Sequence, residues 1–143
     1  TFVDRDGQEK RPYMVHRALL GSLERFFGVL IEHYGGAFPA WLAPVQAMVV
    51  PVAPAFIEYA DQVARRLKDN GLRAEADGSD DRMNAKIRKA QTQKVPWILV
   101  VGESEKEADS VNLRKRSGER AGTMSVADFL SYADGVVQGR GIE

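Results

Sequence analysis

The chain has 143 residues, of which 44% are hydrophobic and 28% charged, and its formal net charge is zero. This composition suits a globular chain with a buried core, and the absence of cysteine excludes disulfides and thiolate metal sites within it. No apolar run approaches the roughly 20 residues that a membrane helix needs and no signal peptide opens the chain, so we expect a cytoplasmic protein with no membrane partner.

Residues 1–16 predict a β-hairpin. Thr1–Val3 and Pro12–His16 are strand-like segments on either side of a turn that contains Asp6-Gly7. Glycine accepts positive φ without steric cost, which makes Asp-Gly a strong turn signal. Because an isolated hairpin is barely stable in water, we expect this one to belong to a larger sheet. The chain starts at Thr1 without a methionine, which indicates a piece of a longer protein.

The next segment, Arg17–Tyr34, predicts a long helix that stops at Gly35-Gly36. Its apolar face consists of side chains at helical spacing: Leu20, Leu23, Phe27, Leu30 and Tyr34. Gly21 and Gly28 lie near Arg25 on the opposite face, although each glycine costs a helix roughly 1 kcal/mol relative to alanine. We interpret this glycine face as a close approach to the backbone, either by a ligand or by another element of the fold.

An apolar, proline-rich connection over residues 37–44 breaks helix and strand alike and marks a boundary between two units. Beyond it, strand and helix patterns alternate. The expected strands are Val45–Val52, Leu72–Ala76, Pro96–Val101 and Ser110–Arg116. The expected helices are Ala55–Asn70, a basic helix capped by Asp80 or Asp81 that runs to about Lys94, and a last helix capped by Ser125 with Asp128. This order predicts an α/β fold with a mixed, mostly parallel sheet flanked by helices.

Charges are segregated along the chain. Basic residues cluster at 82–94 and 114–120, whereas acidic residues gather at 77–81 and 103–109. Such segregation can give a neutral protein a basic face for nucleic acid, but charge alone favours the simpler interpretation of a solvated helix face and a charge-protected edge strand. The sequence contains no Walker-type phosphate loop, no GxGxxG motif and no Cys/His zinc cluster.

Residues 11–26 read RPYMVHRALLGSLERF and resemble motif 3 of class II aminoacyl-tRNA synthetases, in particular of their threonine-specific members. Residues 38–46, FPAWLAPVQ, resemble the junction of the catalytic and anticodon-binding domains in that family. The resemblance covers essentially the whole chain. It implies that residues 1–43, the hairpin and long helix, end a catalytic domain and that residues 44–143 form an anticodon-binding domain. It also implies a parent ligase that charges tRNA with threonine at the expense of ATP.

The resemblance gives roles to residues of the first unit. Arg25 corresponds to the catalytic arginine that binds the ATP phosphates, where a guanidinium stabilises developing charge. Gly21 and Ser22 fall where the family binds ATP and substrate. His16 corresponds to a zinc ligand whose partners precede this segment in the family. One imidazole cannot hold zinc, and motifs 1 and 2 lie outside the chain. We therefore expect zinc, ATP and magnesium in the parent only, and no aminoacylation by this chain alone.

In the second unit, the resemblance places base-reading residues at Glu105 and Arg114. A carboxylate can accept from guanine N–H groups, and an arginine can pair with or stack on exposed bases. Asp80 corresponds to an asparagine in some relatives, and aspartate lacks the amide donor. The expected RNA-backbone contacts, with a solvated face as the alternative for each, are Lys86, Lys89, Lys94 and Arg116. Trp97 heads a buried strand, so we expect it in the core.

The resemblance implies four partners: a tRNA with a threonine anticodon, ATP, threonine, and a second parent subunit that dimerises through the catalytic domain. A non-catalytic RNA-binding accessory module or paralogue is one alternative, but it would have no use for His16 and Arg25. A prolyl or glycyl synthetase is a second, which the residues 15–17 and 38–41 disfavour. A flavodoxin-like small-molecule binder is a third, and the missing glycine-rich loop after Val45–Val52 argues against it.

Overall fold

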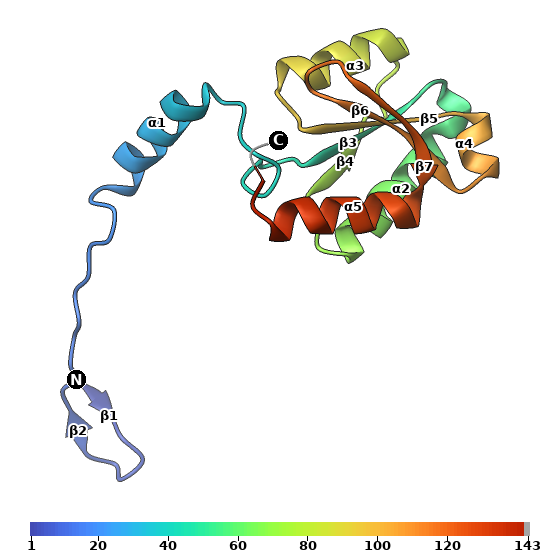
Figure 1. Ribbon diagram of the computed structural model, residues 1–143. Coiled ribbons are helices and arrows are strands. Elements are labelled where there is room, and N and C mark those ends of the chain that lie inside the picture. The colour runs from blue at the N-terminus through green and yellow to red at the C-terminus, as the bar shows by residue number, and fades with distance from the viewer. Residues whose placement is uncertain (142–143) are drawn as a thin grey trace.

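An extended N-terminal arm and an α/β domain make up the chain in the computed structural model, which describes residues 1–141 (Figure 1). The arm carries strands β1 and β2 and helix α1, and it projects away from the sheet and its helices. The last two residues of the predicted second unit, 142–143, lie outside the described residues.

The predicted hairpin exists, but it is shorter than expected. Strand β1 (Phe2–Val3) pairs with β2 (Glu9–Lys10), so the prediction of a second strand at Pro12–His16 is wrong. The turn closes directly after β1, where the Gly7 N–H donates to the Asp4 carbonyl at 2.9 Å. This tight turn sets a register in which Phe2 pairs with Lys10, so β1 has no residue left to pair with Pro12. Proline also has no N–H to extend the ladder. Among the described residues the hairpin forms a sheet of its own, not part of a larger one.

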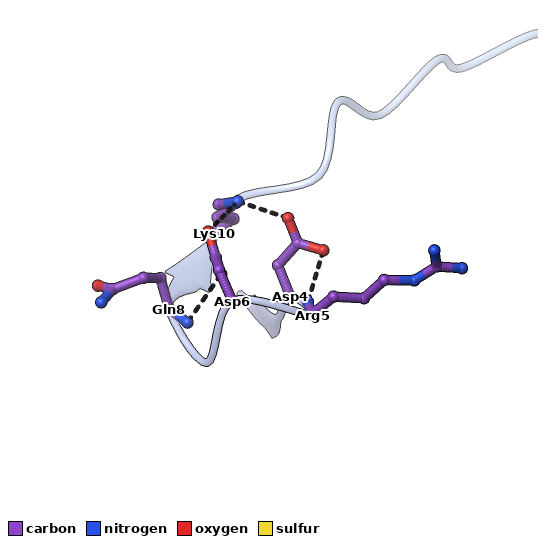
Figure 2. A network of polar contacts seen from close by, with 5 residues as sticks. All are labelled: Asp4, Arg5, Asp6, Gln8 and Lys10. Carbon is purple, nitrogen blue, oxygen red and sulfur yellow. Dashed lines mark hydrogen bonds and ion pairs between the residues drawn. The ribbon is translucent and has the colours of Figure 1, made fainter.

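A charged network ties the hairpin turn together, as Figure 2 shows. The Lys10 ammonium lies 2.5 Å from Asp4 Oδ2 and 2.7 Å from Asp6 Oδ2. The second oxygens of these carboxylates accept from main-chain N–H groups, that of Arg5 at 2.8 Å and that of Gln8 at 3.0 Å. One cation therefore holds two carboxylates that also stabilise the turn backbone.

Both hairpin carboxylates are expected to titrate below the ordinary aspartate pKa of 3.8, chiefly because Lys10 donates to them. A lowered folded pKa means that this stabilisation is present above pH 3.8 and is lost as the pH falls through the lowered values. The raised pKa of Lys10 acts at the other end: its stabilisation is present below pH 10.5 and is lost as the pH rises through the raised value. An NMR titration of Asp4 and Asp6 measures the acid midpoints, and Lys10→Gln should return both toward 3.8. Midpoints at or above 3.8 in the unmodified chain would show that the network does not form in solution.

Helix α1 (Leu23–Tyr34) starts later than the predicted Arg17. Ser22 caps it, because the Ser22 Oγ accepts from the Arg25 N–H at 3.3 Å, and Gly21 has a φ of +68° just before the cap. Gly21 is therefore not inside the helix, contrary to the prediction. None of the α1 residues is buried within the described part of the chain, so its apolar face is exposed. Gly35, at φ +55°, ends the helix as expected.

The domain sheet has the strand order β4-β3-β5-β6-β7. Its strands are β3 (Ala47–Pro51), β4 (Ala74–Ala76), β5 (Trp97–Val101), β6 (Ser110–Lys115) and β7 (Arg120–Ser125). Strands β4, β3 and β5 are parallel, whereas β6 and β7 add antiparallel pairings. The α/β class and the mixed sheet are thus confirmed, with one strand more than predicted. Strand β7 is a polar edge strand with little burial, so it lacks the hydrophobic run that reveals the others.

Helices cover the two faces of the sheet unequally (Figure 1). Helix α2 (Ile57–Asp69), which follows a 3-10 turn at Pro54–Phe56, and helix α5 (Val126–Gln138) bury one face. Helix α3 (Met83–Thr92) alone packs on the other, and the short α4 (Glu103–Glu107) follows β5. The predicted Ser125 cap of the last helix is confirmed by the Asp128 N–H bond at 3.0 Å. The predicted aspartate cap of α3 is wrong, because Arg82 stands at that position without a side-chain bond.

Candidate functional site

The carboxyl ends of the three parallel strands meet at one edge of the sheet. Asp80 lies beyond β4 in the exposed loop before α3, and Glu105 lies beyond β5 within α4. In open α/β sheets, ligands bind outside the carboxyl ends of the strands. The fold therefore brings two of the predicted RNA-reading residues to the same edge.

Glu105 is held by the start of its own helix. Its Oε2 accepts from the Gly102 N–H at 3.0 Å, which caps α4. The Tyr59 hydroxyl lies 3.2 Å from the Glu105 carbonyl and 3.0 Å from the Ser110 carbonyl and donates to this pair. Burial, aided by the negative charge of Asp109, raises the pKa of Tyr59, which keeps the hydroxyl protonated as a donor. These bonds fix the carboxylate in a half-buried, oriented position.

A second surface lies on the α3 side of the sheet, over β6. On the opposite side the buried core extends to Val111 and Leu113 of β6, but under α3 it stops at Ile98 and Val100 of β5. Arg114 is paired with Ile98 and therefore points to this α3 side. We call the strand surface that α3 leaves uncovered the open face.

Polar groups occupy the open face where apolar ones would otherwise lie. Asn112 pairs with Val100, so its side chain joins Arg114 there, and its amide donates to the Thr123 hydroxyl of β7 at 3.1 Å. The Arg114 Nε is buried and has no hydrogen-bond partner among the described residues. Arg120 is the cross-strand neighbour of Arg114, at an irregularity in the pairing of β6 and β7. The open face thus carries two guanidinium groups, and one of them has a donor without a partner in the part of the chain that the structure describes.

Glu105 and Arg114 are not adjacent. Glu105 is close to Ser110 at the start of β6, whereas Arg114 is four residues further along the strand. At about 3.3 Å per residue this separates the two sites by about 13 Å along β6. A ligand that touches both must be extended, as a single-stranded nucleic acid loop is.

The loop that carries Asp80 is braced from within. Lys86 is 3% exposed and its ammonium donates to the Asp77 carbonyl at 3.0 Å. Burial acts to raise the pKa of Asp77, but hydrogen bonds from Ser79 and the charges of Lys89 and Lys86 outweigh it and keep that pKa below its ordinary value. Lys86 therefore supports the loop backbone, and its burial leaves it poorly placed for the predicted RNA-backbone contact.

The other predicted RNA-backbone residues divide into two kinds. Lys89 is exposed on α3 and fits the expected position of a phosphate contact. The Lys94 ammonium instead donates to the Gly35 carbonyl, and the Arg116 guanidinium donates to the Phe38 carbonyl. Both carbonyls belong to the connection between arm and domain, so these two cations bind the main chain of the protein itself.

The residues predicted for catalysis, substrate binding and zinc binding all lie on the arm. His16 is in the extended segment before α1, Ser22 is the α1 cap, and Arg25 is exposed in its first turn. Within residues 1–141 no group of three or more His, Asp or Glu side chains could hold a metal ion, so the described residues do not fit a zinc site around His16. In the same part of the chain, no helix is long and apolar enough to cross a membrane.

Asn112 and Thr123 of the open face were not predicted from the sequence, and Arg120 was predicted only as a member of the basic cluster at 114–120. Strand alternation gives Asn112 and Arg114 the same face, which was the available signal for Asn112. Arg120 and Thr123 lie on β7, and without that strand no sequence pattern could place them opposite β6.

Comparison with known proteins places this geometry in context. A family model described as "Anticodon binding domain" matches residues 46–134. A threonine–tRNA ligase of Thermus thermophilus is 59% identical over 133 residues, which cover 93% of this chain and 20% of that protein. The threonine–tRNA ligase of Treponema pallidum strain Nichols is 57% identical over 131 residues, 92% of this chain and 22% of that protein. The chain thus spans about a fifth of the length of these curated relatives.

Solved structures have the same architecture. The RNA binding domain of threonyl-tRNA synthetase from Cryptosporidium parvum Iowa II matches with a TM-score of 0.76 and 34% identity, over 81% of this chain and 29% of that one. Histidyl-tRNA synthetase from Nostoc sp. PCC 7120 matches with a TM-score of 0.59 and 20% identity, over 64% of this chain and 22% of that one, a likeness of fold alone.

Proposed function

This chain belongs to the family of anticodon binding domains, and on that premise we propose that it binds the anticodon loop of a tRNA that accepts threonine. The threonine–tRNA ligases that it resembles over nine-tenths of its length support the choice of tRNA. The observation that carries the proposal is the open face, where Asn112 and Arg114 of β6 and the neighbouring Arg120 of β7 lie beyond the apolar core under α3. Guanidinium and amide groups on such a surface can pair with or stack on exposed RNA bases.

In this proposal Arg114 reads one base on the open face, and Glu105 reads another at the carboxyl edge of the sheet. Glu105 is oriented by its bond to the Gly102 N–H, which restrains the carboxylate instead of letting it rotate freely. Asp80, in the exposed loop beside that edge, adds an acceptor. Lys89 contributes charge toward the phosphates, which adds affinity without base information.

The activity of the whole protein is a wider proposal. We infer a cytoplasmic threonine–tRNA ligase that uses ATP and magnesium and is a dimer through its catalytic domain, with residues 1–43 ending that domain and 44–143 reading the anticodon. Arg25 would bind the ATP phosphates, beside Gly21 and Ser22, and His16 would be one of several zinc ligands. A non-catalytic RNA-binding module is the alternative, and the ligase names of the relatives weigh against it.

The test is a titration of the chain with two RNA stem-loops of equal length. One carries a threonine anticodon, and the other has its second and third anticodon bases exchanged. We expect tighter binding to the first at every salt concentration, because base contacts discriminate whereas phosphate contacts do not. Equal affinity for both stem-loops would remove base reading from the proposal, and no binding to either would remove the RNA function.

A further inference from the structure

The connection between arm and domain, residues Gly35–Pro44, has the sequence of a loose linker but is packed onto the domain. Ala40 is fully buried and Ala43 is 3% exposed. The N–H groups of Leu42 and Ala43 both donate to the Pro39 carbonyl at 2.9 Å, which folds the segment into a turn. We call this segment the connector.

Two residues of the domain, Gln46 and Arg73, form hydrogen bonds with the carboxyl-terminal half of the connector. The buried Gln46 donates its Nε2 to the Ala40 carbonyl at 2.8 Å and accepts the Arg73 N–H on its Oε1, also at 2.8 Å. The Arg73 side chain then donates its Nε to the Ala43 carbonyl at 2.8 Å and its Nη2 to the Trp41 carbonyl at 2.9 Å. The two donors of one rigid guanidinium therefore fix two peptide planes of the connector at once.

Two more cations hold its amino half. Arg116, which follows β6, donates to the Phe38 carbonyl, and its own N–H donates to the Pro96 carbonyl at 3.1 Å, which ties it to β5. Burial lowers the pKa of Arg116, and the carbonyl offsets part of that desolvation. Lys94 has a φ of +58° and donates to the Gly35 carbonyl at the end of α1, where a cation also suits the helix dipole.

Four domain side chains thus bind five carbonyls of the connector. The carbonyls are those of Gly35, Phe38, Ala40, Trp41 and Ala43. A flexible tether would leave its carbonyls to water. Gly35 and Gly36, with φ of +55° and +77°, are conformationally permissive, so the direction of α1 must be set by contacts on either side of them. Lys94 supplies one at Gly35 itself and Arg116 supplies one at Phe38, whose ring also meets that of Tyr34 at the end of α1.

We propose that Arg73 and Arg116 are positioning residues that lock the connector, so that α1 and the catalytic unit it leads from leave the domain in one direction. Arg116 directly follows the strand that carries Arg114, so the proposed base-reading arginine and the connector anchor lie two residues apart in the chain. The lock rests on protein contacts alone and does not depend on RNA binding.

The direction of α1 can be measured by pulsed EPR, because the chain has no cysteine and accepts spin labels at chosen sites. Labels at Glu32→Cys in α1 and Arg65→Cys in α2, both exposed, report on the arm and the domain. We expect one narrow distance distribution in the otherwise unchanged chain. Arg73→Gln with Arg116→Gln should replace it by a broad one, because the shorter, neutral amide lacks the charge and the forked donors of a guanidinium. Arg116→Lys, which keeps a charged donor on a long side chain, should give a narrower distribution than Arg116→Gln. Arg88→Gln removes an exposed charge from α3 and should leave the distribution narrow.

A variant that only destabilises the domain would also lower its melting temperature, so the melting temperature of each variant is measured alongside. The lock predicts a broad distance distribution without such a loss of stability. If the double variant does not fold, Arg116→Gln alone serves, with the hydrogen exchange of the Leu42 and Ala43 N–H groups as a second measure that should accelerate. A broad distribution in the unchanged chain, or a narrow one in a folded variant that lacks these donors, would overturn the lock. Loss of stem-loop binding in the unchanged chain contradicts the proposed function but leaves this inference standing.

Discussion

Replacement of Trp97 by alanine is expected to lower the free energy of unfolding of the domain by about 3–5 kcal/mol. Trp97 is 2% exposed and begins β5 at the centre of the sheet. Its ring meets that of Phe129 edge-on, with 5.6 Å between the ring centroids, and its centroid lies 6.0 Å from that of Tyr132. Both partners are on α5. Truncation would leave a cavity between the sheet and α5 and remove both aromatic contacts. Because whole domains are stable by only about 5–15 kcal/mol, this is a large part of the total.

Urea denaturation followed by far-ultraviolet circular dichroism, which does not depend on the number of tryptophans, measures the loss. Trp97→Phe keeps an aromatic ring in the core and gives a smaller change, which covers the case in which the alanine variant does not fold. Tyr13→Ala is the matched control, since Tyr13 is fully exposed on the arm and its change should stay within about 0.5 kcal/mol. A loss below about 1 kcal/mol for Trp97→Ala would contradict the packing seen here.

Arg114→Ala is expected to weaken binding of the threonine anticodon stem-loop by about 1–3 kcal/mol and to relax its discrimination at one base. The reason is the placement of this side chain on the open face, paired with Ile98, with its Nε lacking a hydrogen-bond partner in the described structure. Removing the side chain also removes a buried donor that has no partner within residues 1–141. The free protein therefore loses no hydrogen bond at this donor, and its free energy of unfolding should not fall for that reason. Titrations with both stem-loops measure the effect.

Lys89→Ala separates base reading from general attraction. Lys89 is exposed on α3, and its loss should weaken both stem-loops alike and reduce the salt dependence of binding. If Arg114→Ala behaves in this same uniform way, Arg114 contributes charge only. If it leaves the affinity for both RNAs unchanged, the open face is not the binding surface.

Much of the fold could be predicted from periodicity. The β-branched runs at β3 and β5 and the amphipathic pattern of α2 come from residues buried on regular repeats, and a local repeat is visible in sequence. Strand β7 and helix α4 could not be predicted in this way. The first is a half-exposed edge strand and the second a five-residue helix, so neither carries an apolar repeat.

Local patterns along the chain were enough to predict the α/β order, the core position of Trp97, the Ser125 cap and the resemblance to synthetases. The partners of the basic residues became clear only from contacts between distant parts of the chain. Lys94 and Arg116 look like phosphate contacts by charge, yet they donate to carbonyls 59 and 78 positions away in the chain. A charge pattern records that a cation is present, whereas its partner depends on which distant backbone the fold brings within reach.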